Sequence, residues 1–351
     1  MNETDRGITA DAQVARVFEW RRGFNTIHLI DVGIKSGLVR ALAEAPGSTA
    51  AELAAKIGLH TPYVETWCRT AYGMEILDAD AGARWRLAPH MDLILANTAH
   101  PRYLGGYVRL GTEVAADDFH RCVEALRTGA TKPFQGRGED FAQAIAESTW
   151  GLQVVTAKKL LPELPGLAPM LDAGGAILEI GCGTGNLLSL LAKTFPKARC
   201  VGVDIDADSL AVARSKIEKA GMNARVEARQ GTVASATQPA TFDAAVMVEV
   251  LHEIAPSARP AVIRESAGAL KPGGWILIVD ETYPSSLEEM RKPEFKFPLM
   301  TGFEEMLWGN VLPTRAEQEE LLRAAGLTGP INRSIIGEGF TVLTTRKGSE
   351  G

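Results

Sequence analysis

The C-terminal half of the chain alternates short apolar runs with stretches of helical spacing. Such alternation predicts a parallel sheet with helices on both faces. The last two apolar runs are separated by only three residues, which is too short for a parallel crossover, so this pair is predicted to be antiparallel. The expected strands are 176–180, 200–204, 225–229, 243–248, 275–280, 331–336 and 340–345, with helices beginning near Asn186, Ala207 and Ser257.

The N-terminal part has a different pattern. Residues 12–45 show helical periodicity, and Thr49 with Glu52 forms the sequence of a capping box. Thr61 is expected to cap a further helix with Pro62 at its first position. Short apolar runs at 76–77 and 85–87 flank a turn-rich segment and predict a small hairpin. Helix, helix and hairpin in this order predict a winged helix-turn-helix.

Composition narrows the class of protein. The 351 residues are 46% apolar and 23% charged, as in ordinary globular proteins, and are enough for two domains. No apolar run reaches the ~18 residues that span a bilayer, and the first residues lack the pattern of a secretory signal. We therefore expect a cytoplasmic protein. The four cysteines lack C-x-x-C spacing, and no metal site is predicted.

Charge argues against nucleic acid and anionic membranes as partners. The formal net charge is −6. Residues 41–80, which would include a recognition helix, hold six acids and two bases, whereas phosphate contacts need clustered Lys or Arg.

A glycine-rich turn follows the first expected strand. Glycines at 181, 183 and 185 leave no side chain between the backbone and a ligand, and they permit positive φ. Asp204 ends the second strand, where doubly wound folds place an acid that binds ribose hydroxyls. The dinucleotide pattern G-x-G-x-x-G would need glycine at Asn186, which weakens a pyrophosphate interpretation. Glu179 would repel a diphosphate but would pair with a cationic amino-acid end, so we expect a ligand with a positive centre and a ribose.

This segment resembles a known family. Glu179-Ile-Gly-Cys-Gly-Thr-Gly185 with Val203-Asp204 is similar to motif I and the acidic strand end of class I S-adenosylmethionine-dependent methyltransferases. The resemblance implies S-adenosylmethionine as cofactor, with Ile205 packing on adenine and Glu249 near the sulfonium. Gly231 and Thr232 would line the adenine edge, although Thr232 stands where many relatives have an acid.

The N-terminal segments Leu38-Val-Arg-Ala-Leu-Ala-Glu44, Ala50–Gly58 and Trp85-Arg-Leu-Ala-Pro89 resemble the N-terminal domain of small-molecule O-methyltransferases of plants and bacteria. In that family the winged module mediates dimerisation and helps to wall the substrate pocket. The resemblance therefore implies a homodimer. The fold class expected is α/β: a Rossmann-like, doubly wound, seven-stranded sheet with an antiparallel last strand, preceded by a winged-helix domain.

The expected domains are a winged-helix dimerisation domain (1–100), a helical linker that borders the substrate pocket (101–165) and a methyltransferase domain (166–351). The linker is expected to hold helices near 112–128, 139–147 and 153–161, and its loop 131–138 and Trp150 are candidates for contacting substrate or cofactor. The insertion 281–313 is rich in aromatic residues and is expected to form a lid; the alternative is a dimer core.

The candidate catalytic group is a histidine. Val250-Leu-His-Glu-Ile254 is similar to the Leu-His-Asp segment of the O-methyltransferases, in which the histidine is the general base. Imidazole can take a hydroxyl proton near neutral pH. Asp280 or Glu281, at the end of a neighbouring strand, could hold the tautomer of His252. Alternatively, His252 only caps a helix or bonds the backbone.

These features predict transfer of the methyl group of S-adenosylmethionine to a small aromatic or α-keto metabolite, with oxygen favoured and carbon or nitrogen left open. Two alternatives remain at this point. The cofactor could be consumed by intramolecular cyclisation of its aminoalkyl chain, or the chain could be a winged-helix regulator that senses the cofactor.

Overall fold

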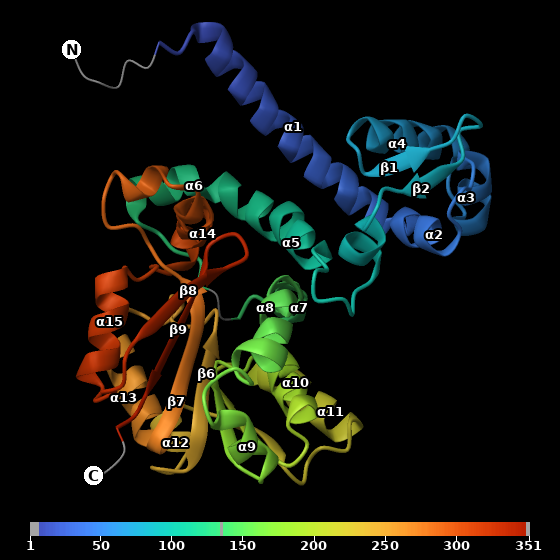
Figure 1. Cartoon of the computed structure of the whole chain (residues 1–351). Helices are drawn as coiled ribbons and strands as arrows, with labels where there is room; N and C mark the ends of the chain where they lie inside the picture. Colours follow the sequence, from blue (N-terminus) through green and yellow to red (C-terminus); the bar gives the residue numbers. More distant parts are fainter. Residues whose placement is uncertain (1–6, 134–135, 349–351) are drawn as a thin grey trace. The chain divides into compact units, whose positions relative to one another are not determined.

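The computed structural model describes residues 7–133 and 136–348. Its contacts divide the chain into two compact units, with the boundary between Val114 and Ala115. The first unit holds the elements of the expected winged-helix module, and the second holds the expected sheet (Figure 1). The finer division at residues 100 and 165 stays a prediction.

The first unit consists of helices and one hairpin. Its elements are α1 (Ala10–Lys35), α2 (Leu38–Glu44), α3 (Ala50–Ile57), α4 (Thr61–Gly73), β1 (Leu77–Ala79), β2 (Trp85–Leu87), η1 (Asp92–Ala96), α5 (Gly105–Arg109) and η2 (Leu110–Ala115), whose last residue already belongs to the second unit.

The helical stretch between residues 12 and 45 is two helices rather than one. Gly37 has a φ of 83° and separates α1 from α2, because a left-handed residue cannot continue a right-handed helix. Leu38 and Leu42 of α2 are buried, whereas the N-terminal part of α1 is exposed. The sequence periodicity runs through this break and does not reveal it.

The local signals of the winged module are confirmed in most details. The amide of Glu52 donates to Oγ1 of Thr49 at 3.2 Å and the amide of Thr49 donates to Oε2 of Glu52 at 2.8 Å, which is the capping box. Strands β1 and β2 pair antiparallel. Thr61 is the first residue of α4 rather than its cap, a position that His60 takes without a side-chain bond.

The core of this unit lies between α2, α3, α4 and the hairpin. Trp67 joins it to α1, since its Nε1 donates to the carbonyl of Leu29 at 2.9 Å. A Cβ on Gly33 would lie 2.3 Å from the Trp67 ring, so only glycine permits this close packing.

The second unit is built on a seven-stranded sheet of order β5-β4-β3-β6-β7-β9-β8. Its first five strands run parallel, and β9 pairs antiparallel with both β7 and β8, as expected. The chain order changes direction between β3 and β6, which is where doubly wound sheets bind ligands. The strands are β3 (Ala176–Ile180), β4 (Arg199–Asp204), β5 (Val226–Gln230), β6 (Phe242–Val248), β7 (Leu270–Glu281), β8 (Asn332–Ile336) and β9 (Phe340–Arg346).

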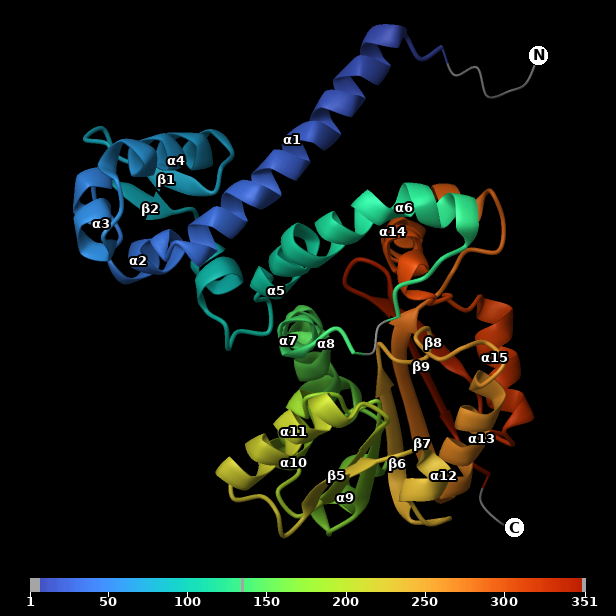
Figure 2. The same ribbon diagram turned by 180° about the vertical axis from the view of Figure 1, so that it is seen from behind.

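Helices cover both faces of this sheet. Figure 2 shows α10 and α11 on one face, and α13 and α15 on the other. The helices are α6 (Ala116–Thr128), α7 (Glu139–Ser148), α8 (Trp150–Val155), η3 (Thr156–Leu160), α9 (Leu167–Asp172), α10 (Asn186–Thr194), α11 (Ala207–Lys219), α12 (Val233–Ala236), α13 (Arg259–Ala269), η4 (Glu289–Arg291), η5 (Pro293–Phe295), α14 (Lys296–Glu304), η6 (Glu305–Trp308) and α15 (Arg315–Ala324).

The aromatic insertion after β7 contains η4, η5, α14 and η6. Its rings pair with rings elsewhere in the second unit, which fixes it against three different elements. The centroid distances are 5.8 Å for Phe303 with Phe119, 4.8 Å for Phe297 with Phe340, and 5.4 Å for Trp308 with Phe141. The lid role stays a prediction.

Among the described residues, none of the helices combines the length and the apolar character that a membrane crossing requires.

Candidate active site

The turn between β3 and α10 has a backbone that favours glycine. Gly181 and Gly185 have φ of 69° and 74°. A Cβ on Gly181 would lie 2.5 Å from Cγ2 of Val250, and a Cβ on Gly185 would lie 2.9 Å from Cβ of Ala213. Glycine is therefore required at both positions for conformation and for space. The turn packs closely against the segment after β6 and against α11.

Asp204, at the end of β4, organises this turn. Its Oδ2 accepts a hydrogen bond from the amide of Gly183 at 2.7 Å, and its Oδ1 accepts one from the amide of Asp206 at 2.9 Å. Burial raises the pKa of Asp204, although these amide bonds act in the opposite direction. The carboxylate thus links the ends of β3 and β4, and each oxygen keeps a lone pair for a ligand.

A cavity of about 410 Å³ opens at the carboxyl ends of the parallel strands. It is lined by eight of the residues expected to bind cofactor: Glu179, Gly181, Gly183, Asp204, Ile205, Gly231, Thr232 and Glu249. Gly185 is not among the lining residues; it packs on Ala213 instead.

One wall of this cavity consists of residues not named from the sequence, although the linker 101–165 is expected to border the substrate pocket. It comes from α7, α8 and the residue between them, and it is formed by Ala142, Ile145, Ala146, Thr149 and Gln153. These positions recur at helical spacing and so share one face. That spacing was the signal in the sequence from which this wall could have been predicted. Trp150, a candidate from the sequence, is not among the lining residues. In the loop 131–138, Phe134 and Gln135 lie outside the described residues.

Glu179 offers the cavity a carboxyl oxygen that has no hydrogen-bond partner among the described residues. Its side chain is buried, and its Oε2 accepts no hydrogen bond from the residues that the structure describes. Burial, and to a lesser degree the charge of Asp204, raise the pKa of Glu179 well above its usual value. A buried carboxylate without a partner is costly. A cationic group in the cavity would therefore be stabilised beside it.

Thr232 has a structural role at its edge of the cavity. Its Oγ1 accepts from the amide of Ser235 at 3.3 Å, and its own amide donates to Oγ of Ser235 at 3.0 Å. This capping box begins the short helix α12. The Thr232 hydroxyl is thus already used within the protein.

His252 lies in the segment after β6 and is held by Asp280. Nδ1 of His252 lies 2.8 Å from Oδ1 of Asp280, and the amide of Leu251 donates to Oδ2 of Asp280 at 2.8 Å. Oε2 of Glu281 lies 3.4 Å from the same Nδ1. The structure therefore brings together the three residues that the sequence nominated for catalysis, all buried.

Sequence reasoning missed a fourth member of this cluster, Glu305. Its Oε2 lies 3.2 Å from Nε2 of His252, so both ring nitrogens face carboxylates. Burial alone would lower the pKa of His252, but Asp280, Glu305 and Glu281 raise it well above its usual value. Glu305 belongs to the aromatic insertion, in which the sequence drew attention to the rings rather than the acids.

The cluster borders the cavity through two further acids. Glu249 and Glu253 line the cavity, whereas His252, Asp280 and Glu281 are buried without lining it. Burial raises the pKa of Glu253 to about 8. Glu249 has a φ of 57°, a left-handed conformation that is strained for a residue with a side chain.

A family model described as a methyltransferase domain matches residues 177–274. The match includes the glycine turn, Asp204, Glu249 and His252. Residues 177–274 therefore form a methyltransferase domain. This agrees with the expectation of a cationic ligand with a ribose and excludes the dinucleotide interpretation of the glycine turn.

Two curated relatives are similar to the methyltransferase. The 3-hydroxy-5-methyl-1-naphthoate 3-O-methyltransferase of Streptomyces sahachiroi is 26% identical over 258 residues, which cover 71% of this chain and 72% of that protein. The ubiquinone biosynthesis O-methyltransferase of Paracidovorax citrulli is 32% identical over 115 residues. That alignment covers 32% of this chain and 45% of the relative, so the chain spans less than half of the ubiquinone enzyme.

A solved structure supports the fold. Human N-acetylserotonin methyltransferase, in complex with SAM, matches with a TM-score of 0.76 and 18% identity, over 99% of this chain and 100% of that chain. The likeness shows that the methyltransferase has the fold class expected from its sequence.

Proposed function

We propose that the protein transfers the methyl group of S-adenosylmethionine to a hydroxyl oxygen of a small, flat acceptor. The observation that carries this proposal is the cavity at the switch in strand order, which combines the Asp204 carboxylate with the unpaired Glu179 carboxylate. A nucleoside with a ribose and an ammonium group matches both acids. A pyrophosphate matches neither.

Different lining residues would contact different parts of the cofactor. Glu179 would pair with the ammonium group, and Asp204 would accept the ribose hydroxyls. Ile205, Gly231 and Thr232 would surround adenine, and Glu249 would lie on the sulfonium side. The bound cofactor supplies an electrophilic methyl group. The protein supplies orientation, and holding two reactants in line can itself contribute much of the rate.

His252 is the proposed general base. Asp280 holds Nδ1, so Nε2 is the nitrogen that would take the proton of the acceptor hydroxyl. Glu305 already contacts Nε2 at 3.2 Å. Neutral imidazole has one lone pair at Nε2, so the acceptor hydroxyl would take the place of Glu305 there, and the nearby carboxylate would stabilise the imidazolium that forms.

The class of acceptor is proposed from two observations. The curated relatives are named as O-methyltransferases, one of a hydroxynaphthoate. The insertion 281–313 is rich in aromatic and apolar side chains. As a wall of the acceptor site it would suit a flat hydroxyaromatic acid or an α-keto metabolite of secondary metabolism. As a lid, this insertion would exclude water from the reacting methyl group.

Product analysis tests the function. The purified chain is incubated with S-adenosylmethionine and a panel of hydroxyaromatic acids and α-keto acids, and products are identified by mass spectrometry. We expect S-adenosylhomocysteine together with an acceptor that has gained one methyl group. Methylthioadenosine as the nucleoside product would instead show cyclisation of the aminoalkyl chain and would overturn the proposal.

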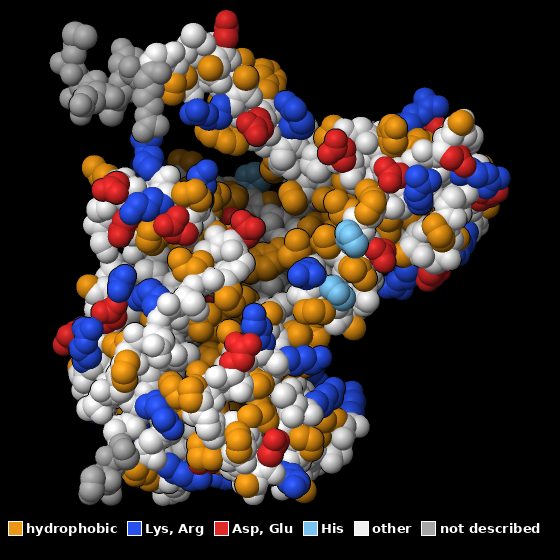
Figure 3. All heavy atoms as spheres, in the orientation of Figure 1, with side chains coloured by type: hydrophobic (Ala, Val, Ile, Leu, Met, Phe, Trp, Pro, Cys, Tyr) orange, Lys and Arg blue, Asp and Glu red, His pale blue; other side chains and the backbone are white. Residues whose placement is uncertain are grey.

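We also propose that the chain works as a homodimer through α1. Figure 3 shows hydrophobic side chains along this helix, and Phe18 and Trp20 are each 64% exposed. Exposed apolar patches of this kind mark interaction surfaces. The resemblance to dimeric O-methyltransferases implies that the partner is a second copy of the chain. We place the dimer in the cytoplasm, where the four free cysteines would stay reduced.

A further inference from the structure

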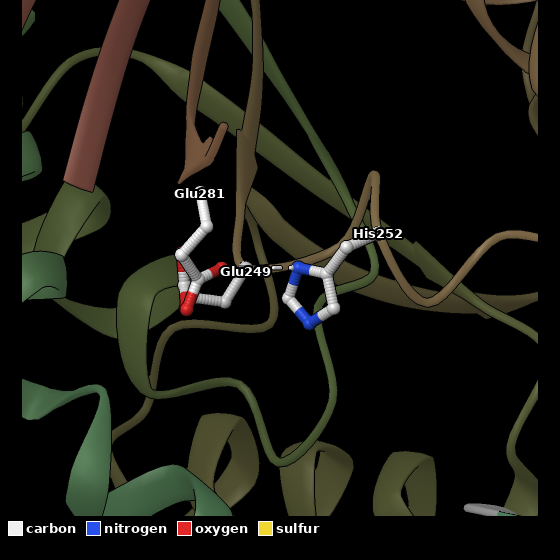
Figure 4. Close-up of side chains that lie close together, drawn as sticks. All are labelled: Glu249, His252 and Glu281. Carbon is white, nitrogen blue, oxygen red and sulfur yellow. Dashed lines mark ion pairs between the residues drawn. The ribbon is translucent and has the colours of Figure 1, made fainter. Parts of the chain in front are cut away.

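Three side chains beside the cofactor cavity converge on one point. Glu249, His252 and Glu281 each offer a ligand atom, and these atoms all lie within 4.8 Å of one another. Figure 4 shows the two carboxylates next to each other and the ring of His252 directed toward them. They are brought together by β6 and β7, which pair in the parallel sheet and end at the same edge.

Two oxygens of this group lack hydrogen-bond partners. Oε1 of Glu249 and Oε2 of Glu281 are buried and accept no hydrogen bond within the described ranges 7–133 and 136–348. Glu281 is only 1% exposed. Burial raises the pKa of both carboxyl groups. The charge of Glu281 raises the pKa of Glu249 further, and the charges of Asp280 and Glu305 raise the pKa of Glu281, although His252 acts to lower both. Such a pair is stable only with protons or with a cation between the oxygens.

The surroundings of His252 suit a metal ligand. A metal-bound histidine usually donates its second ring N–H to a carboxylate, which fixes the tautomer. Glu305 occupies that position at Nε2, so Nδ1 would face the ion, and His252 would act as the proposed general base only while no ion is bound. Oδ1 of Asp280, 2.8 Å from Nδ1, lies within reach as an additional oxygen ligand. The spacing of these residues in the sequence had predicted no metal site, because the ligands come from two strand ends.

We propose that Glu249, His252 and Glu281 bind one divalent cation that accepts mixed oxygen and nitrogen ligands, such as Mn²⁺ or Fe²⁺. Three protein ligands leave coordination positions open. An acceptor with two neighbouring oxygens, such as an α-hydroxy or α-keto acid, would fill them beside the cofactor. This statement about the acceptor rests on the proposed function, whereas binding of the ion does not.

Mn²⁺ titration of the chelator-treated full chain tests the site. We expect one Mn²⁺ per chain by calorimetry and by electron paramagnetic resonance. Glu249→Gln and Glu281→Gln should each weaken binding by at least the ~10–100-fold typical of losing a supporting residue. Because the cation displaces protons, its affinity should fall as pH is lowered.

Glu304→Gln is the matched control. Glu304 is also a carboxyl whose pKa is raised to about 7 by burial, yet it is not part of the group, so its loss should leave Mn²⁺ affinity unchanged. S-adenosylhomocysteine binding, measured on every variant, reports folding and the cofactor site independently. Intact nucleoside binding without Mn²⁺ binding, or Mn²⁺ binding that neither glutamine variant weakens, would overturn the metal site alone. If the unmodified chain does not bind S-adenosylhomocysteine, that result would instead contradict the proposed function.

Discussion

Oε2 of Glu305 lies 3.2 Å from Nε2 of His252. This contact joins the insertion after β7 to the segment after β6, and it places the proposed base between carboxylates on both sides. Any movement of the insertion would therefore change the charge around His252. In the proposed mechanism, movement of the insertion would thus affect proton transfer as well as closure.

Glu305→Gln should shift the pH dependence of methyl transfer. Burial lowers the pKa of His252, but Glu305 is one of the three acids that raise it above its usual value. Removing this charge should lower the pKa, so the acidic limb of the profile of kcat/KM against pH should move to lower pH. His252→Ala should lose ~10²-fold or more in kcat. Glu304→Gln serves as the control, and an unshifted profile in Glu305→Gln would contradict the coupling.

Asp204→Asn should weaken binding of S-adenosylhomocysteine. The substitution removes a charged acceptor that also holds the amide of Gly183. Hydrogen bonds to charged groups contribute about 1.5–3 kcal/mol, which corresponds to roughly a tenfold to hundredfold change in the dissociation constant. Calorimetry measures the effect. Asp208→Asn, an exposed acid at the start of α11, is the control. Equal affinity in the two variants would show that Asp204 does not hold the ribose.

Gly181→Ala should destabilise the protein more than Gly166→Ala. Both glycines have positive φ, 69° and 78°, so both substitutions should cost the ~1–2 kcal/mol of a left-handed residue. Only Gly181 would also press a Cβ against Val250, whereas no atom lies within 4 Å of a Cβ on Gly166 in the described structure. Overpacking adds about 1–3 kcal/mol. Denaturant unfolding should reveal this difference, and equal losses would argue against the close packing.

Stability should fall as pH rises through the range in which Glu253 titrates. Burial raises the pKa of Glu253 from 4.5 to about 8, so the folded protein holds a proton that the unfolded chain releases. Its contribution is complete below pH 4.5 and is lost by about pH 8. One such group changes stability by up to ~1.4 kcal/mol per pH unit.

Glu253→Gln should flatten this slope, as measured by the free energy of unfolding between mildly acidic and mildly alkaline pH. The measurement uses chelator-treated protein without nucleoside, so that ligand binding does not add its own pH dependence. A slope as steep as that of the unmodified chain would show that Glu253 is ionised when buried.

Phe18→Glu should disrupt the proposed dimer. Phe18 is exposed on α1, and a charge there would be buried at an interface between two copies. Light scattering after size exclusion should show a shift from dimer to monomer. Leu287→Glu is the control, because Leu287 is 82% exposed and lies outside α1. If Phe18→Glu keeps the molar mass of the dimer in solution, or if the unmodified chain is monomeric, α1 is excluded as the interface.

The sequence by itself determined the architecture, because its signals are local. Apolar runs fixed the seven strands, and the short separation of β8 and β9 fixed their antiparallel pairing. The glycine turn and Asp204 could be recognised because each must follow its own strand. Eight of the nine predicted cofactor residues accordingly line one cavity.

Tertiary structure alone decided which charges meet. Glu305 is distant in sequence from His252, and the pairing of Glu249 with Glu281 depends on the register of β6 with β7. Likewise, the cavity wall from α7 and α8 depends on how those helices pack on the sheet. Electrostatic contacts of this kind depend on distances between segments, which no local pattern of apolar and polar residues encodes.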